Sequence, residues 1–510
     1  MNEAATTRQG SLISNSRWNL FAFSFGLAAQ FITLPFVIRW IGLPAFGQAG
    51  LVLAVWAPLM LVGTVLGQAT TREAAAFQGQ PIAARQTLAA ALWMCLAACA
   101  VGLVAVISLG PWLVAKLTSG PAPLADVRLA FAIAGAGWAT QQVVLVLQGA
   151  TAARQEFRTM AQVAAFSSCA TVVLTLSFAA ARPTAVGYLA GVAASMLATL
   201  FAWLVVGRPR GSHPVALPRW HRTEAVGLLQ FGRWQGLAQL AGALGNQIDR
   251  YALGALAPSS LVGQYNAANR LQEAAYMGVM KGGEILFPHF GATASSALAD
   301  RQSFFVMASW LTGTLSVVFL APIVPLAHSL LLLWAGAETA DGGAFLLRTL
   351  VLGGIVGCGS NVFTYYAMGT GRTRPLAGLS VAYSLLTIVA TIGLMQMFGP
   401  LAAGAGLLVA SVFRVVAAIV LTRRLFFPDL EWGLLAIATL LPLVAGSAVS
   451  LAVDASGAAL VSNWPAVVLG YVAVAAAVLL ATLALTLPWP GGRAIVGRVL
   501  AAIRELHAAP

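Results

Sequence analysis

The feature that most constrains the fold of this chain is a series of apolar runs, each about 20 residues long, that recur along nearly the whole sequence. A bilayer core of about 30 Å needs roughly 20 residues of helix per crossing. Because backbone N–H and C=O groups find no water there, such a run must be helical. The runs predict an all-α polytopic membrane protein. Charged residues make up only 8% of the 510 residues, which excludes an ordinary soluble domain.

We predict fourteen membrane-spanning helices, arranged as six, six and two. The first six lie near residues 18–38, 48–70, 87–109, 128–148, 159–180 and 184–206. After a polar stretch, the remaining eight lie near residues 228–254, 261–287, 303–326, 345–368, 376–397, 400–422, 432–453 and 465–487. The first run continues too far to be the core of a signal peptide, so we expect it to be an uncleaved helix.

The distribution of basic residues orients these helices. Fourteen crossings put both termini on one side of the membrane. The loops on that side hold eighteen Lys and Arg residues and the opposite loops hold five. The positive-inside rule therefore places both termini in the cytoplasm. This topology explains the net charge of +13 better than nucleic-acid binding does, so no nucleic-acid partner is expected.

An internal repeat suggests how the chain is organised. An offset of 216 residues pairs Arg17 with Arg233 and Gly47 with Gly263, among seven identities in the 36 positions from residue 17. The polar break falls where a duplication of six helices would place it. We therefore predict two pseudo-symmetric lobes around a central cavity, as in many transporters. The expected domains are an N-terminal lobe (1–206), a cytoplasmic linker (207–226), a C-terminal lobe (227–424), two additional helices (425–487) and an amphipathic tail (488–510) along the cytoplasmic membrane surface.

Charged residues inside the membrane concentrate in the eighth predicted helix. An ionisable group at the bilayer centre costs roughly 2.5–3.5 kcal/mol on the insertion scale, so such groups face protein or water. At about 100° per residue, the polar residues of this helix share one arc of about 80°. They are Asn266, Arg270, Glu273, Lys281 and Glu284. This ladder indicates a hydrated translocation cavity, or alternatively structural ion pairs at i, i+3 spacing.

The seventh predicted helix has a matching polar stripe. Gln235, Gln239, Asn246 and Asp249 share a similar arc of about 80°. Two adjacent helices thus turn polar stripes inward. Asp249 and Arg250 lie near the periplasmic end, where we expect a solvated interfacial pair.

Two further arginine positions suggest anion binding. Arg17 and Arg233 each begin the first helix of a lobe, where a helix N-terminus favours anions and a guanidinium adds a bidentate phosphate donor. Ordinary anchoring beside an interfacial tryptophan is the alternative. Arg414 stands alone in the twelfth helix and requires an anionic partner or water.

The sequence lacks the motifs of several enzyme classes. The only lysines, Lys116 and Lys281, follow Ala115 and Met280, so no phosphate-binding loop ending in Gly-Lys-Ser/Thr occurs. The five histidines form no His-Glu-x-x-His motif. The longest predicted periplasmic loops, 110–127 and 327–344, are short for a membrane glycosyltransferase or polymerase. We expect neither enzymatic activity nor a cofactor or metal.

Short motifs resemble bacterial polysaccharide flippases of the multidrug/oligosaccharidyl-lipid/polysaccharide exporter superfamily. The similar segments are 14–19 (Ser-Asn-Ser-Arg-Trp-Asn), 36–42 (Phe-Val-Ile-Arg-Trp-Ile-Gly), 46–47 (Phe-Gly), 246–251 (Asn-Gln-Ile-Asp-Arg-Tyr), 263–271 (Gly-Gln-Tyr-Asn-Ala-Ala-Asn-Arg-Leu) and 287–288 (Phe-Pro). The resemblance extends over most of the first twelve helices.

The resemblance implies a function and partners. A flippase of this family moves an undecaprenyl-pyrophosphate-linked oligosaccharide from the cytoplasmic to the periplasmic leaflet of the bacterial inner membrane by alternating access. The products are O-antigen, capsule or exopolysaccharide, and the implied partners are membrane lipid, a polysaccharide polymerase and a chain-length regulator. By this resemblance we assign pyrophosphate binding to Arg17, Arg233, Arg270 and Lys281, glycan binding to Gln235, Gln239, Asn246 and Asn266, and ion coupling to Glu273, Glu284 and Asp249.

Other functions remain open. A multidrug or organic-cation antiporter of the same superfamily should have an acidic cavity. In this sequence the intramembrane segments contain five basic residues and only three acidic ones. A lipid II flippase also has fourteen helices, but it places several cations in its first lobe. A membrane glycosyltransferase or polymerase is disfavoured by the short loops.

Overall fold

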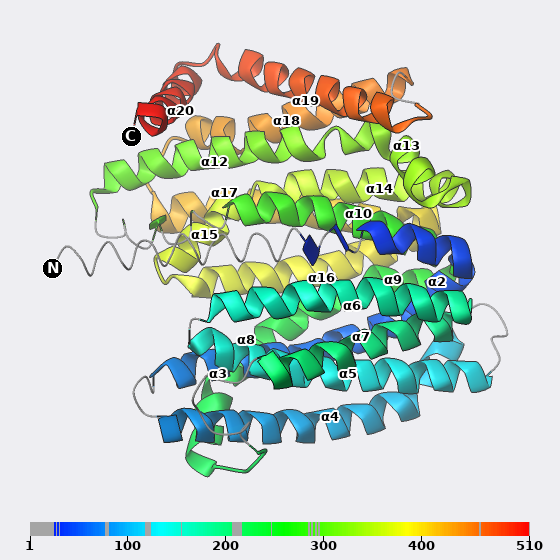
Figure 1. Cartoon of the computed structure of the whole chain (residues 1–510). Helices are drawn as coiled ribbons and strands as arrows, with labels where there is room; N and C mark the ends of the chain where they lie inside the picture. The colour runs from blue at the N-terminus through cyan, green and yellow to red at the C-terminus, as the bar shows by residue number, and fades with distance from the viewer. Residues whose placement is uncertain are drawn as a thin grey trace. The chain divides into compact units, whose positions relative to one another are not determined.

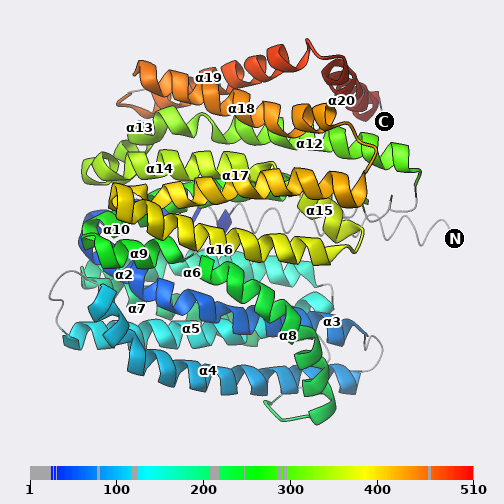
Figure 2. The same ribbon diagram turned by 180° about the vertical axis from the view of Figure 1, so that it is seen from behind.

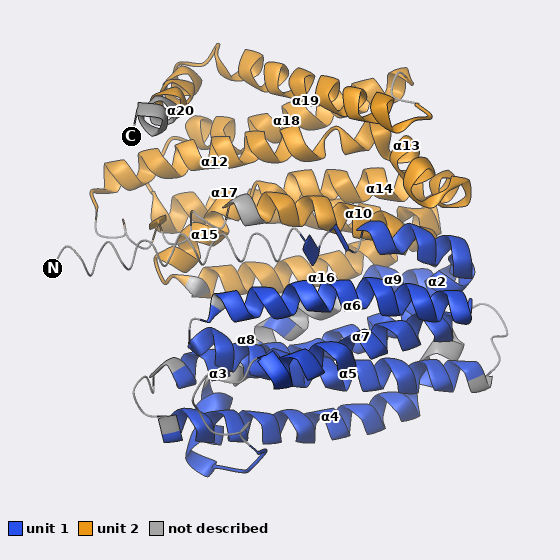
Figure 3. Ribbon diagram, viewed as in Figure 1, with its two compact units in different colours: residues 1–263 blue, residues 264–510 orange. Residues whose placement is uncertain are grey.

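The structure, a computed structural model, describes residues 25–26, 28–29, 31–76, 81–117, 124–154, 156–206, 217–245, 247–283, 286, 289–290, 293, 296–457 and 461–508 (Figure 1). In these residues every regular element is helical. Two compact units divide the chain, residues 1–263 and 264–510 (Figure 3).

The helices of the first unit begin with an apolar segment at Phe31–Ile41. They continue with α2 (Leu43–Trp56), η1 (Ala57–Met60), α3 (Leu61–Ala76), α4 (Pro81–Leu117), α5 (Leu124–Ala153), α6 (Phe157–Ala181), α7 (Ala185–Val206), α8 (Arg222–Gly245) and α9 (Ile248–Leu256). Helix α10 (Ser259–Gly283) begins in the first unit and continues into the second.

The second unit contains the remaining helices. They are α12 (Leu298–Leu320), α13 (Ile323–Ala335), α14 (Ala337–Cys358), α15 (Asn361–Gly369), α16 (Thr373–Phe398), η2 (Pro400–Ala402), α17 (Ala403–Leu421), η3 (Thr422–Phe426), α18 (Trp432–Ser456), α19 (Trp464–Thr486) and α20 (Pro490–Ala508). Helices α18 and α19 lie beside α12 in both views (Figures 1 and 2).

The prediction of an all-α polytopic membrane protein is confirmed. Within the described residues, eleven helical spans are long and apolar enough to cross a membrane, and each coincides with one of the fourteen predicted. The other three predicted spans are the first, which lies partly outside the described residues, and the seventh and eighth. The last two are helical but rich in polar residues, which is why they do not stand out as apolar spans.

Three predicted boundaries were wrong. The seventh span is divided into α8 and α9 around Gln247, and the tenth is divided at Gly359 and Ser360. The expected loop at 327–344 is mostly helix, because α13 and α14 are joined by one residue, Gly336. This glycine has a φ of +96°, a conformation that glycine adopts without steric cost, so the chain can turn without a long loop.

Within the first unit, α9 forms a hydrogen bond with the second span beside a proline. Pro58 has no N–H, so it cannot donate to the carbonyl of Ala54 four residues earlier, and the span passes through the 3₁₀ turn η1. The Tyr251 hydroxyl of α9 donates to that Ala54 oxygen at 2.6 Å. The Ala57 N–H also donates to this oxygen, so the tyrosine adds a second hydrogen bond beside the proline break.

Glycines allow α2 and the start of α10 to cross closely. A Cβ at Gly47 would lie 2.0 Å from the Ser259 carbonyl oxygen, and a Cβ at Gly263 would lie 2.4 Å from the Leu43 oxygen. Gly47 and Gly263 are equivalent in the 216-residue repeat, and so are Leu43 and Ser259. The two contacts are thus reciprocal, as contacts across a two-fold axis are.

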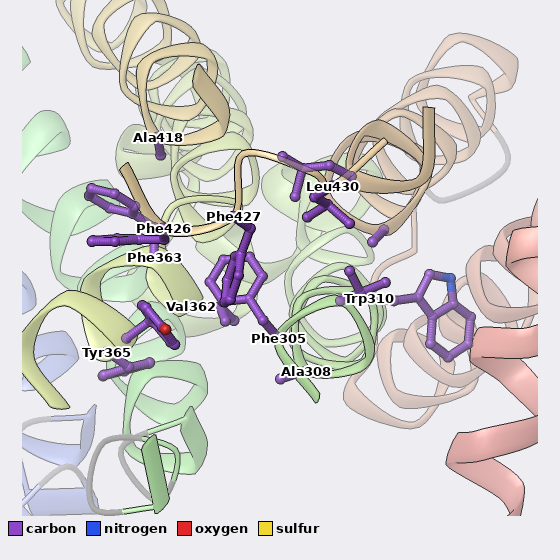
Figure 4. Packing of buried hydrophobic residues seen from close by; sticks show 14 of the residues in the cluster. Phe305, Ala308, Trp310, Val362, Phe363, Tyr365, Ala418, Phe426, Phe427 and Leu430 are labelled. Atoms are coloured by element: carbon purple, nitrogen blue, oxygen red, sulfur yellow. The ribbon is translucent and has the colours of Figure 1, made fainter. Parts of the chain in front are cut away.

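An aromatic cluster fills one end of the second unit (Figure 4). Phe305 of α12 lies 5.3 Å from Phe427, between ring centroids, and Phe363 of α15 lies 5.6 Å from Phe426. The tail helix α20 adds its buried Ile495 and Val499 to this cluster. The amphipathic helix predicted at the C-terminus therefore exists, but part of its apolar face packs on protein instead of lying on a membrane surface.

The division into lobes of six helices stays a prediction. In the structure α8 and α9 pack with α3, α4 and α2 in the first unit, so this packing division comes later in the chain than the expected linker at 207–226. The two compact units are defined by packing, whereas the predicted lobes are defined by the internal repeat, so the two divisions need not coincide.

Candidate functional site

The structure describes the side chains of five of the eleven candidate residues. Arg17, Asn246 and Glu284 lie outside the described residues. Arg233 and Gln235 lie on α8 and Lys281 lies on α10, with only their backbone described. The five described side chains are those of Gln239, Asp249, Asn266, Arg270 and Glu273.

Glu273 is the centre of a polar cluster near the middle of α10. Its Oε1 accepts a hydrogen bond from the Asn269 Nδ2 at 2.7 Å, and its Oε2 lies 3.3 Å from the Arg270 NH1. The i, i+3 ion pair suggested by the spacing is therefore present. Asn269 was not among the predicted site residues, although it donates to the Glu273 carboxylate. Its position four residues before Glu273 on the same helix could have identified it as a partner.

The ion pair lies on the exposed side of the helix. The side chains of Arg270 and Glu273 are 49% and 46% exposed, and Met277 continues the same face. The opposite face is buried through Tyr265 and Gln272. Charges at the middle of a membrane-length helix do not tolerate lipid, so a half-exposed pair there requires water or a polar ligand.

Asn266 does not share this exposed face. Only 5% of its surface is exposed, although the helical wheel placed it in the same arc. The start of α10 is enclosed on several sides, since Gly263 meets α2 and Gln264 donates to the Glu338 carbonyl of α14 at 2.7 Å. Asn266 is therefore enclosed in this conformation, and its glycan-binding role stays a prediction.

In the first unit, Gln239 pairs with an amide that the sequence reasoning overlooked. The Gln239 Nε2 of α8 donates to the Gln68 Oε1 of α3 at 3.2 Å. Gln68 is the sole side-chain amide of α3, and burying an amide in an apolar environment has a high free-energy cost. That cost was the signal that could have identified it.

Asp249 and Arg250 are not the solvated pair that we expected. Arg250 is only 9% exposed, and its NH1 donates to the Gln247 Oε1 at 2.5 Å. The Asp249 Oδ1 accepts from the Arg250 backbone N–H at 3.3 Å. A guanidinium held in this way stabilises the break between α8 and α9, so Arg250 has a structural role.

A protein-family comparison matches more than half of the chain. The model of the family described as "Polysaccharide biosynthesis protein" matches residues 12–294. None of the curated proteins compared with the chain matches it significantly.

Several solved structures share the fold. The lipid II flippase MurJ in an inward closed conformation has a TM-score of 0.70 at 10% identity, covering 92% of this chain and 97% of that one. An inward-facing multidrug resistance MATE family transporter of the MOP superfamily has a TM-score of 0.67 at 14% identity, covering 79% and 97%.

A third similar structure is a MOP superfamily transporter from Pyrococcus furiosus, whose binding pocket is described as having reversed polarity. Its TM-score is 0.58 at 16% identity, covering 80% of this chain and 94% of that one. At these identities the matches show the fold alone. The chain therefore has the polytopic fold of MOP superfamily transporters.

Proposed function

Because the chain belongs to the polysaccharide biosynthesis protein family and has a MOP transporter fold, we propose that it is a lipid-linked oligosaccharide flippase. The cargo is an undecaprenyl-pyrophosphate-linked unit that moves from the cytoplasmic to the periplasmic leaflet by alternating access. The setting is the bacterial inner membrane, both termini are cytoplasmic, and the product is O-antigen, capsule or exopolysaccharide.

The observation that best supports this proposal is the half-exposed ion pair on α10. A guanidinium on a hydrated face can bind pyrophosphate with paired N–H groups, and the adjacent carboxylate can exchange a proton with water. The amides of Gln239 and Gln68 offer hydrogen bonds of the kind that sugar hydroxyls make. The lipid tail can stay in the bilayer throughout.

The roles proposed for the remaining residues follow from the same chemistry. Arg17, Arg233 and Lys281 add cations for the pyrophosphate. Gln235, Asn246 and Asn266 add amides for the glycan, of which Asn266 is reachable only if α10 moves, since it is buried in this conformation. Glu284 and Asp249 are the further candidates for ion coupling.

The test is leaflet translocation in proteoliposomes. A lipid-pyrophosphate-linked oligosaccharide is incorporated, and its appearance on the opposite leaflet is followed with an added glycosidase. We expect Arg270→Ala and Arg233→Ala each to slow translocation about tenfold or more, because a hydrogen bond to a charged group contributes about 1.5–3 kcal/mol. Arg424→Ala, at an exposed arginine of η3, is the matched control and should keep the wild-type rate.

The result that would overturn the proposal is a wild-type protein that inserts and folds but moves no lipid-linked sugar. If the same vesicles showed proton-coupled efflux of an organic cation, the antiporter function would replace it. Equal rates in the wild type and both arginine variants would instead remove the assigned pyrophosphate site.

A further inference from the structure

The lone intramembrane arginine noted in the sequence, Arg414, faces the inside of the second unit. The exposed face of α17 includes Val409, Val412 and Val416. Arg414 is displaced by about 160° from both Val412 and Val416 at 100° per residue. The side chain is nevertheless only half-buried. Its accessible surface therefore opens on the interior side of the helix, away from lipid.

The neighbours of Arg414 are uncharged and come from several helices. The guanidinium carbon lies 5.1 Å from the ring centroid of Tyr383 on α16. Tyr276 of α10 and Cys358 at the end of α14 are close enough to interact with its charge. A single cation–π contact offsets less than the cost of placing an arginine inside a membrane.

One polar group close to Arg414 is already engaged with a neighbour. The Tyr276 hydroxyl donates to the Asn361 Oδ1 at 3.4 Å. In the described part of the chain Arg414 forms no ion pair with a carboxylate. A guanidinium has five N–H donors, and these neighbours leave them without anionic acceptors.

The break in the tenth span adjoins Tyr276, whose hydroxyl donates to Asn361, the first residue of α15. Helix α14 ends at Cys358, and the first backbone bond of α15 runs from the Thr364 N–H to the Ser360 oxygen. The first N–H groups of a helix lack intrahelical acceptors and favour anions. A glycine suits this position, since a Cβ at Gly359 would lie 2.7 Å from the Leu443 Cδ1.

We propose that Arg414, with Tyr383, Tyr276 and the start of α15 around it, forms an anion-binding site inside the second unit. The ligand class is an anion that accepts guanidinium and backbone N–H donors, such as a phosphate group. It has two sources: the pyrophosphate of the cargo, in which case the site rests on the proposed function, or a free inorganic anion that neutralises Arg414.

The test measures anion-dependent stability of the purified full chain in detergent. Thermal unfolding is recorded in sodium gluconate, and chloride, inorganic phosphate or inorganic pyrophosphate is then titrated in at constant ionic strength. A bound anion raises the unfolding midpoint, since it binds only the folded state. We expect at least one of these anions to raise the midpoint of the wild type, and Arg414→Gln to weaken its apparent affinity tenfold or more.

Two variants keep the result interpretable. Arg424→Gln removes an exposed cation of η3 and should respond to the anions as the wild type does. Arg414→Lys keeps the charge but loses the forked donor geometry, so it should bind with intermediate affinity even if Arg414→Gln fails to fold. The inference is overturned if the wild type shows no anion response, or if both Arg414 variants respond like the wild type.

The probes distinguish the two sources. An effect of chloride equal to that of pyrophosphate identifies a free inorganic anion, whereas an effect confined to phosphate and pyrophosphate identifies a phosphate group. The assay contains no translocation step. Loss of lipid translocation with a retained Arg414-dependent anion response would refute the flippase function and leave this site standing.

Discussion

At the scale of single residues, the polar side chains of the seventh and eighth spans divide into two groups. Arg270 and Glu273 pair on an exposed face of α10, where a ligand or water can reach them. Arg250 and Tyr251 are used internally, one bonded to Gln247 and the other to the Ala54 carbonyl. Some polar residues of these two spans therefore stabilise the packing, while others nearby remain accessible to a ligand.

We expect Tyr251→Phe to destabilise the protein by about 1 kcal/mol. The change removes the hydroxyl that donates to the Ala54 oxygen, and a typical intramolecular hydrogen bond contributes about 0.5–1.5 kcal/mol. Denaturant unfolding in detergent, followed by tryptophan fluorescence, measures the difference. Tyr383→Phe is the matched control, because the contact of Tyr383 with Arg414 is made by its ring. Equal losses in the two variants would contradict the role given to Tyr251.

At the scale of elements, close helix crossings depend on glycine. The crossing of α2 with the start of α10 brings Gly47 and Gly263 against backbone atoms, and the contacts are reciprocal under the repeat. On helix α14, Gly342 and Gly354 lie against the side chains of Gln264 and Gln272 of α10. Lipid is as apolar as the side chains, so the hydrophobic effect does not hold such helices together. Close van der Waals packing, which small residues allow, does so instead.

Gly47→Ala should destabilise the protein by about 1–3 kcal/mol, because the new Cβ would meet the Ser259 carbonyl and backbone must shift. Gly378→Ala on α16 meets nothing within 4 Å, so the better helix propensity of alanine should leave it unchanged or up to about 1 kcal/mol more stable. Unfolding midpoints of the purified variants compare the two. Equal stability of the Gly47→Ala and Gly378→Ala proteins would contradict this prediction, because it would show that α2 and α10 can move apart without loss of stability.

At the scale of the whole molecule, composition and loop charge predict a membrane topology. The match to MurJ covers 92% of the chain and the MATE match covers 79%, so the longer match accounts for more of the sequence. In the second unit the last two helices are joined to the others by specific bonds. Arg348 of α14 lies 2.7 Å from Asp454 of α18, and the Trp310 Nε1 donates to the Thr486 Oγ1 at 3.1 Å. These helices are integral to that unit.

Reporter fusions test the topology directly. Green fluorescent protein fused after Val206 or at the C-terminus should fluoresce, because the positive-inside rule places both points in the cytoplasm. Alkaline phosphatase inserted after Pro183, between α6 and α7, should be active in the periplasm. The fourteen-helix topology has nine crossings between Pro183 and the C-terminus. Phosphatase activity at both points would require an even number of crossings and would refute this topology.

The sequence by itself determined the helical membrane fold and the position of most spans, because the bilayer imposes one length and one hydrogen-bonding solution on each apolar run. It also determined the i, i+3 pairing of Arg270 with Glu273, which depends on local helix geometry alone. These are properties of single helices.

Tertiary structure decided everything that depends on which helices are neighbours. It buried Asn266 beneath crossing helices, paired Gln239 with Gln68 from a distant span, and gave Tyr251 the carbonyl that Pro58 leaves without its usual donor. It also placed Arg414 among uncharged groups of several helices instead of beside a carboxylate. A helical wheel shows the direction in which a side chain points, but the partner that it meets there is set by long-range packing.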